Sequence, residues 1–172
     1  MASKKKISKA IQNKLKRIRM VVLDVDGVLT DGSIIYGSDR TEYKRFNVHD
    51  GYGIFRSRKK GLLFSIISGR VSKVTTIRAR RLEIADVFQG NEDKVSAFQE
   101  IKKKYKLEYD EVCFIGDDEF DLPLLRKVGF SAAPADAMIR VRNEVDHVTE
   151  TDGGRGAVRE VIDMILEAKK LL

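Results

Sequence analysis

Two short apolar runs, each ending in a cluster of carboxylates, constrain the fold of this chain more than any other feature. Met20–Leu23 leads into Asp24-Val25-Asp26-Gly27, and Val112–Ile115 leads into Gly116-Asp117-Asp118. Short runs of this kind are typical of buried strands. One carboxylate pair fits a turn equally well, but like charges this dense after two strands are costly unless a cation lies among them. The pattern predicts a sheet with a cation-binding edge.

Apolar runs alternate with helical patterns along the chain, which predicts an α/β fold. We expect a Rossmann-like three-layer sandwich in which a mostly parallel sheet carries helices on both faces. The exception is segment 31–46, where apolar residues flank the run Gly37–Arg40 and predict a β-hairpin insertion. The expected strands are 20–25, 62–67, 84–87, 112–115, 129–132 and 146–148, and the expected helices are 52–60, 71–81, 94–105, 118–127, 136–142 and 156–171.

Length and composition favour a single domain over residues 20–172. The chain has 172 residues, 42% of them hydrophobic, and no repeat or Gly/Ser-rich linker. The sequence contains neither an apolar run long enough to span a membrane nor an apolar secretory signal. Cys113 is the only cysteine, so it cannot form an intrachain disulfide and is expected to be a small core residue. These features predict a cytoplasmic protein.

The net charge of +7 comes from the first 19 residues. Residues 1–19 contain eight basic and no acidic side chains, which leaves 25 basic against 26 acidic side chains in the remainder. Ile7, Ile11, Leu15 and Ile18 recur at helical spacing. We predict a basic amphipathic helix over residues 1–19 that packs on its own domain. An anionic partner such as nucleic acid or a membrane, or a frayed end, are the alternatives.

Three polar clusters each follow an expected strand. Asp24 and Asp26 close the first, Ser68-Gly69-Arg70 follows the second, and Asp117 follows the strand at 112–115. Ligands of open parallel sheets bind at the carboxyl ends of the strands. The three clusters therefore predict one site.

The residue types at these strand ends favour phosphoryl transfer assisted by Mg²⁺. Carboxylates and backbone carbonyls suit a hard divalent cation, whereas the two histidines and one cysteine of the chain form no zinc-binding pattern. Ser68 precedes an expected helix, whose N-terminus can hold phosphate oxygens, and Lys94 adds a positive charge. An aspartate can attack phosphorus while a second acts as acid and base. The sequence has no P-loop, which disfavours a nucleoside triphosphatase.

The four motifs, in this order, resemble those of the haloacid dehalogenase-type phosphatases. Asp24–Val28 is similar to their first motif, Ser68 to the second, Lys94 to the third and Gly116–Asp121 to the fourth. The resemblance implies several roles: Asp24 as nucleophile, Asp26 as general acid/base, Ser68 and Lys94 as phosphate ligands, and Asp24, the Asp26 backbone oxygen and Asp117 as Mg²⁺ ligands. Asp118 and Asp121 would orient the metal and the lysine, or cap a helix.

The spacing of the motifs leaves no room for a cap domain. Ser68 follows Asp24 by 44 positions and Lys94 follows Ser68 by 26 positions. Because a site without a cap is open to water and small-substrate specificity needs closure, the expected hairpin is a candidate lid or subunit contact.

The finer resemblance is to the capless 3-deoxy-D-manno-octulosonate-8-phosphate phosphatases, over about residues 18–166. The segments that carry it are Asp24–Gly32, Phe46–Ile54, Ser68–Arg70 and Gly153–Glu160. It implies tetramers in which a neighbour's hairpin and the glycine-rich tail help to cover each site, and an eight-carbon acidic sugar phosphate, a lipopolysaccharide precursor, as substrate. The substrate-binding residues that it implies are Asp26, Asn47, Val48, His49, Asp50, Gly51, Arg70, Arg78 and Lys94.

Two positions depart from the pattern of this family. His49 stands where many relatives carry arginine, and Phe55 stands where a basic residue is frequent. Arg78 also fits a solvated helix face, Asp50-Gly51 a helix cap and turn, and Gly153–Gly156 a plain loop.

Three other functions remain open from the sequence. A related phosphatase of a nine-carbon ulosonate 9-phosphate, or of another small sugar phosphate, is the nearest, although Arg70 favours the eight-carbon substrate. A non-catalytic oligomeric module and a nucleic-acid-binding protein are the others, and we expect neither nucleic acid nor membrane as a partner.

Overall fold

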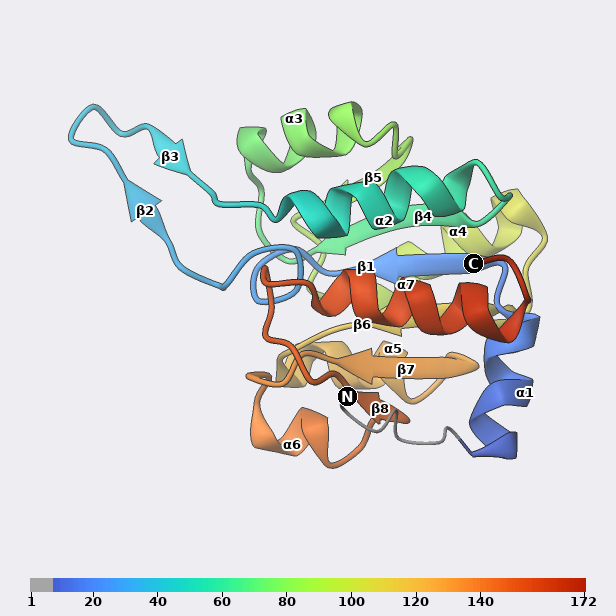
Figure 1. Cartoon of the computed structure of the whole chain (residues 1–172). Helices are drawn as coiled ribbons and strands as arrows, with labels where there is room; N and C mark the ends of the chain where they lie inside the picture. Colours follow the sequence, from blue (N-terminus) through green and yellow to red (C-terminus); the bar gives the residue numbers. More distant parts are fainter. Residues whose placement is uncertain (1–7) are drawn as a thin grey trace, which may run out of the picture.

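Strand β1 (Met20–Leu23) lies near the centre of a six-stranded sheet in the computed structural model, which describes residues 8–172 (Figure 1). Met20 is paired with Leu63 on one side and with Val112 on the other, and all the neighbouring strands are parallel. The order β5-β4-β1-β6-β7-β8 confirms the predicted parallel sheet. Its other strands are β4 (Leu63–Ser68), β5 (Asp86–Gln89), β6 (Val112–Ile115), β7 (Phe130–Ala133) and β8 (His147–Val148).

Helices cover both faces of the sheet, as predicted for a three-layer sandwich. Val21 and Leu23 point into one apolar core and Met20 and Val22 into the other, because successive side chains of a strand face opposite ways. Figure 1 shows α2 and α7 in front of the sheet and α4 and α5 behind it. The first core includes residues of α1 (Lys9–Arg17), α2 (Val48–Arg58), α3 (Lys73–Arg81) and α7 (Ala157–Ala168), and the second of α4 (Lys94–Tyr105), α5 (Leu122–Leu125) and α6 (Ile139–Arg142).

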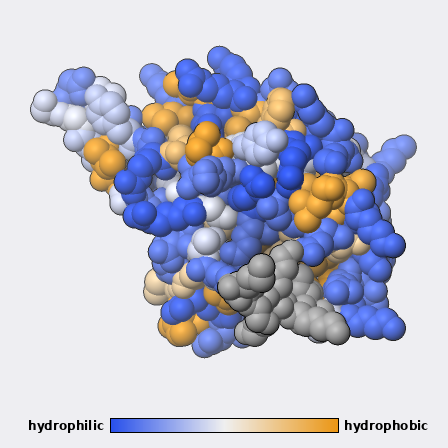
Figure 2. Space-filling model, viewed as in Figure 1, coloured by the Kyte–Doolittle hydropathy of each residue, from blue (hydrophilic) through white to orange (hydrophobic). Residues whose placement is uncertain are grey.

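The predicted hairpin is present, with shorter strands than expected. Strands β2 (Ile35–Tyr36) and β3 (Glu42–Tyr43) pair antiparallel, and Arg40 closes the turn with a positive φ of 67°. The hairpin projects from the body of the molecule (Figure 1), and Figure 2 shows hydrophobic colour on it. Ile35 and Tyr36 are 48% and 66% exposed. No cap domain stands between β1 and β4 or between β4 and α4.

Several element boundaries differ from the predicted ones because polar groups set them. Helix α2 begins at Val48, four residues earlier than expected, since the Asn47 side chain accepts the His49 N–H as an N-cap. The helix expected over 118–127 is split into a 3₁₀ turn, Glu119–Asp121, followed by α5. Pro123 lies in the first turn of α5, where a missing N–H is tolerated.

Helix α1 lies within the predicted N-terminal helix but ends at Arg17, because Ile18 has extended backbone. Ser8 caps it by accepting the Ile11 N–H, and Leu15 and Ile18 are fully buried in the core that includes α7. Ile7 and the rest of residues 1–7 lie outside the described residues, and the division of the chain at residue 19 stays a prediction. Among the helices of residues 8–172, none is long and apolar enough to cross a membrane.

Candidate active site

Three carboxylates converge where β1 and β6 end. Asp24 directly follows β1, Asp117 follows β6 by two residues, and Asp121 ends the 3₁₀ turn after it. One oxygen of each lies within 4.8 Å of the others. The Asp24 N–H donates to the Ile115 carbonyl at 3.1 Å, so the sheet ladder itself aligns the two strand ends. The carboxylates thus lie together at the strand ends where the sequence predicts a cation-binding edge.

Lys94, the first residue of α4, binds two of these carboxylates. Its ammonium lies 2.7 Å from Asp24 Oδ1 and 2.5 Å from Asp121 Oδ1, and the Lys94 side chain is 1% exposed. The Asp93 side chain caps α4 and so fixes where Lys94 stands. Burial opposes the charge of Lys94, but Asp24 and Asp121 outweigh this effect and raise the pKa of Lys94 above its usual value.

Asp121 holds the neighbouring loop as well as the lysine. Its Oδ2 accepts the backbone N–H groups of Asp117 at 2.9 Å and Asp118 at 3.2 Å. Asp118 caps the 3₁₀ turn by accepting the Glu119 N–H. These contacts hold the loop in place, and they leave Asp117 Oδ1 without a hydrogen-bond partner among the described residues.

The site fits a hard divalent cation. Asp117 Oδ1 is buried and has no hydrogen-bond partner in the described structure, and an orphaned buried carboxylate oxygen is expensive. Burial, together with the other carboxylates, raises the pKa of Asp24 to about 7 and that of Asp117 to about 8. A bound Mg²⁺ would remove both penalties, because it neutralises the charges and supplies the missing partner.

Asp26, the second aspartate of the first motif, faces the hairpin rather than Asp24. Its carboxylate forms an ion pair with Lys44, and Arg70 Nη1 lies 3.8 Å from the other Asp26 oxygen. Lys44 was missed by the sequence analysis. A lysine next to a two-residue strand carries no local signal, since only the folding of the hairpin over the β1 end brings it to Asp26.

Ser68 ends β4 and is 3% exposed. Its hydroxyl accepts the Arg70 N–H at 3.3 Å. The following helix, α3, begins at Lys73 rather than at Val71 as predicted, because Ser72 has extended backbone and its N–H donates to Gln89 Oε1 at 2.7 Å. The prediction that a helix N-terminus begins at Val71 beside Ser68 is therefore wrong, and the loop 69–72 takes that place.

The loop after Asp26 is pressed against the glycine-rich tail of the same chain. A Cβ added to Gly153 would lie 1.8 Å from the Gly27 carbonyl oxygen, so only glycine allows this approach. The Gly154 N–H donates to the Val28 carbonyl at 3.0 Å. The tail therefore braces the loop that carries Asp26.

The substrate residues expected around α2 contact one another rather than the carboxylates. Arg78 Nη2 donates to the Asn47 carbonyl at 3.0 Å, and Asn47 Nδ2 donates to the Gly154 carbonyl at 3.3 Å. Asp50 is 1% exposed and accepts the Arg159 N–H at 2.8 Å, so it caps the start of α7. Burial raises the pKa of Asp50.

The remaining residues of that group have no contact with the site either. Val48 is 75% exposed, His49 is exposed beside it, and a Cβ on Gly51 would lie 2.6 Å from Arg78 Nη2. Within residues 8–172, no hydrogen bond or ion pair joins residues 47–51 or Arg78 to Asp24, Lys94 or Asp117. Within one chain, Asp50 thus acts as a helix cap, which agrees with the alternative interpretation of Asp50-Gly51 as a cap and turn.

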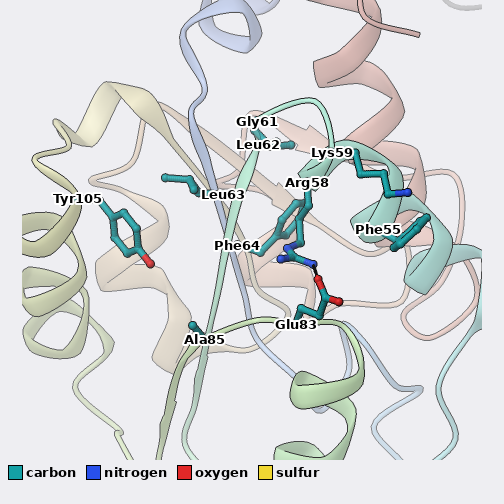
Figure 3. Close-up of a pocket in the computed structure, with 10 residues that line it drawn as sticks. All are labelled: Phe55, Arg58, Lys59, Gly61, Leu62, Leu63, Phe64, Glu83, Ala85 and Tyr105. Atoms are coloured by element: carbon teal, nitrogen blue, oxygen red, sulfur yellow. Dashed lines mark hydrogen bonds and ion pairs between the residues drawn. The ribbon is translucent and has the colours of Figure 1, made fainter.

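A hollow of about 340 Å³ lies at the opposite end of the sheet (Figure 3). Residues 62–64, at the start of β4, line it, whereas the carboxylates lie beyond the strand ends. Phe55 also lines it, and Arg58 forms an ion pair with Glu83 at its rim. This hollow is separate from the carboxylate site.

Known proteins are similar to this chain in sequence and in structure. Residues 38–162 match the family described as haloacid dehalogenase-like hydrolases. The chain belongs to this family. The 3-deoxy-D-manno-octulosonate 8-phosphate phosphatase KdsC of Escherichia coli K12 is 42% identical over 163 residues, which are 95% of this chain and 87% of the relative.

Solved structures of haloacid dehalogenase-like hydrolases are also similar. The 3-deoxy-D-manno-octulosonate 8-phosphate phosphatase of Yersinia pestis has a TM-score of 0.95 and 40% identity, covering 96% of this chain and 90% of its own. The enzyme of Moraxella catarrhalis, solved with magnesium, phosphate and KDO, has a TM-score of 0.91 and 40% identity, covering 93% and 92%. The Haemophilus influenzae enzyme was solved in a cobalt-bound form; its TM-score is 0.88, its identity 41%, and the match covers 91% of this chain and 92% of its own.

Proposed function

We propose that this chain is a magnesium-dependent phosphomonoesterase that hydrolyses 3-deoxy-D-manno-octulosonate 8-phosphate to the free sugar acid and phosphate. The observation that carries the proposal is the buried Asp24, held by Lys94 beside a partnerless oxygen of Asp117. The relatives named for this substrate, one of them solved with magnesium, phosphate and KDO, supply its identity. The product is a precursor of lipopolysaccharide.

The reaction has two steps, each carried by the aspartates of the first motif. In the first, an Asp24 oxygen forms a bond to phosphorus, the bond between phosphorus and the sugar oxygen breaks, and Asp26 donates a proton to that oxygen. In the second, a water oxygen bonds to phosphorus, the aspartyl-phosphate bond breaks, and Asp26 takes up the water proton. Lys94 stabilises the charge of Asp24 and of the phosphate oxygens throughout.

Mg²⁺ would be held by the carboxylates of Asp24 and Asp117 and by the backbone carbonyl of Asp26. When bound, it neutralises negative charge on the transferring phosphoryl group. Asp118 and Asp121 orient these ligands and the lysine.

The phosphate and the sugar acid require further donors. Ser68, at the end of β4, is proposed to bind a phosphate oxygen. Arg70 Nη1 is buried without a hydrogen-bond partner, which suits it to a substrate oxygen, and arginine grips carboxylates with paired hydrogen bonds.

The residues around the start of α2 are proposed to complete the site of a neighbouring copy. Residues 47–51 and Arg78 have no contact with their own Asp24, and the hairpin exposes apolar residues such as Ile34 and Tyr36. Both features suit a homo-oligomer, and we propose the tetramer that the family resemblance implies. We further propose that the enzyme works in the cytoplasm, with a small-molecule substrate as its ligand.

Phosphate release in the presence of Mg²⁺ tests the proposal. The eight-carbon 8-phosphate is compared with a nine-carbon ulosonate 9-phosphate and with simple sugar phosphates, and the Asp24→Asn variant serves as the control. We expect a strong preference for the eight-carbon substrate and no turnover by the variant. Equal, slow hydrolysis of all substrates would keep the chemistry but reject the substrate, and His49 and Phe55 would be examined first. If none of these substrates is hydrolysed, the proposed phosphatase activity is rejected.

A further inference from the structure

The hairpin supplies a buried cation to the first motif. The Lys44 side chain is 1% exposed, although it leaves the chain next to strand β3, whose Tyr43 is 54% exposed. Its ammonium forms an ion pair with Asp26, whose side chain is 19% exposed, and lies 3.8 Å from Glu42. A buried lysine is rare unless it is paired. Such pairs contribute little net stability compared with apolar residues of the same size, so the pair needs another explanation.

Glu42 ties Lys44 to the second motif. Its Oε1 accepts from Arg70 Nη2 at 3.1 Å and its Oε2 accepts from the Ser72 hydroxyl at 2.6 Å. Arg70 Nη2 also donates to the Tyr36 hydroxyl at 3.3 Å. The hairpin is therefore held on the loop that follows Ser68 by several polar contacts, and the position of Lys44 is fixed from that side.

The pair fixes which way the acid/base points. One Asp26 oxygen is engaged by Lys44 and the other lies 3.8 Å from Arg70 Nη1, so the carboxylate is held between these two side chains. A general acid acts only within hydrogen-bond reach of the leaving oxygen. An Asp26 side chain free to rotate would lose that alignment.

We infer that Lys44, held by Glu42, is a positioning residue that aligns Asp26 for proton transfer to the leaving group. This inference rests on the proposed phosphatase activity. It assigns to the hairpin a part in the chemistry of its own subunit, in addition to any contact between subunits. The bonds that form and break are those of the first step above, and Lys44 itself exchanges no proton.

The leaving group separates this role from a merely structural one. The sugar oxygen needs a proton as it departs, whereas p-nitrophenolate leaves without one. The ratio kcat/KM reports the steps through leaving-group departure. We expect Lys44→Met to lower kcat/KM for the sugar phosphate by about 10- to 100-fold and that for p-nitrophenyl phosphate by less than about threefold. Asp26→Asn should give the same pattern, more strongly.

A double-mutant cycle tests whether Lys44 acts through Asp26. We expect the Lys44→Met/Asp26→Asn variant to be no slower than Asp26→Asn alone, because residues that act as a unit are not additive. Arg45→Met is the matched control: Arg45 lies next to Lys44 and pairs with Asp31, but its side chain is 66% exposed. This variant should keep the wild-type values for both substrates.

A second variant keeps the inference testable if Lys44→Met does not fold. Lys44→Cys, made in a Cys113→Ala background, is assayed before and after alkylation with 2-bromoethylamine, which restores an ammonium at nearly the original length. Recovery for the sugar phosphate supports the inference. Equal losses for both substrates, additive losses in the cycle, or no recovery in protein that mass spectrometry shows to be alkylated at position 44 would overturn it. Failure of the wild-type protein to hydrolyse any phosphate ester would instead reject the proposed function.

Discussion

Two buried lysines hold the two aspartates of the first motif, and they do so from different parts of the molecule. Lys94 begins α4, in the body of the fold, and binds Asp24 and Asp121, whose side chains are 3% and 0% exposed. Lys44 lies next to a two-residue strand of the projecting hairpin and binds Asp26, which is partly exposed. Asp24, the proposed nucleophile, is thus held from the core, and Asp26, the proposed acid/base, is held from an insertion. The two aspartates are therefore held in place by separate parts of the molecule.

Replacement of each lysine should give the largest difference in stability and turnover between the two regions. Lys94→Met leaves two buried carboxylates without their cation, so we expect a loss of about 3–5 kcal/mol in the free energy of unfolding and loss of turnover with every substrate. Lys44→Met leaves a more exposed partner, and we expect about 1–3 kcal/mol. Urea denaturation measures both values. Equal destabilisation by the two changes would break the comparison.

The sequence predicted the Lys94 cluster but not the Lys44 pair. Asp24, Asp117 and Lys94 each follow from strand and helix ends, which a parallel sheet brings to one edge whatever the details of packing. Lys44 reaches Asp26 only because a hairpin folds back over that edge, and hairpin direction depends on contacts such as that of Glu42 with Arg70. Residues 47–51 were predicted as one group, but their packing on α7 depends on long-range contacts that the local pattern does not contain.

The contact between the loop after Asp26 and the glycine-rich tail should have a smaller effect than either lysine. In Gly153→Ala, the new Cβ would collide with the Gly27 carbonyl, and we expect kcat to fall by about 10- to 100-fold because the loop that carries Asp26 must shift. Gly61→Ala is the control. Gly61 has a φ of +88°, and a Cβ added there would meet nothing within 4 Å, so the change should cost about 1 kcal/mol of stability without altering kcat. Wild-type kcat in Gly153→Ala would show that the tail does not brace the loop.

The pH dependence of stability sharpens the account of the core cluster. Without metal, burial raises the pKa of Asp24 to about 7 and that of Asp117 to about 8, well above the ordinary value of an aspartate. The folded chain therefore binds more protons than the unfolded chain between about pH 4 and pH 8, and its free energy of unfolding falls as the pH rises through this window. The slope is at most about 1.4 kcal/mol per pH unit for each proton. Asp50, whose pKa is also raised, adds to the same trend.

Mg²⁺ takes the place of these protons, so the fall should flatten when it is present. Thermal unfolding at several pH values, with EDTA or with Mg²⁺, measures both slopes. The Asp117→Asn variant should flatten the metal-free slope and lose most of the response to Mg²⁺. A metal-free protein whose stability rises between pH 5 and pH 8 would contradict the account.

The central claim is that Asp24 carries the phosphoryl group, and acid quenching of a single turnover tests it most directly. Substrate labelled with ³²P is mixed with enzyme and Mg²⁺, and the precipitated protein is counted for the wild-type chain and for Asp24→Asn. We expect transient label on the wild-type chain, in acid-stable and alkali-labile form as for an acyl phosphate, and none on the variant. Equal labelling of the variant, or its turnover at the wild-type rate, would contradict the claim.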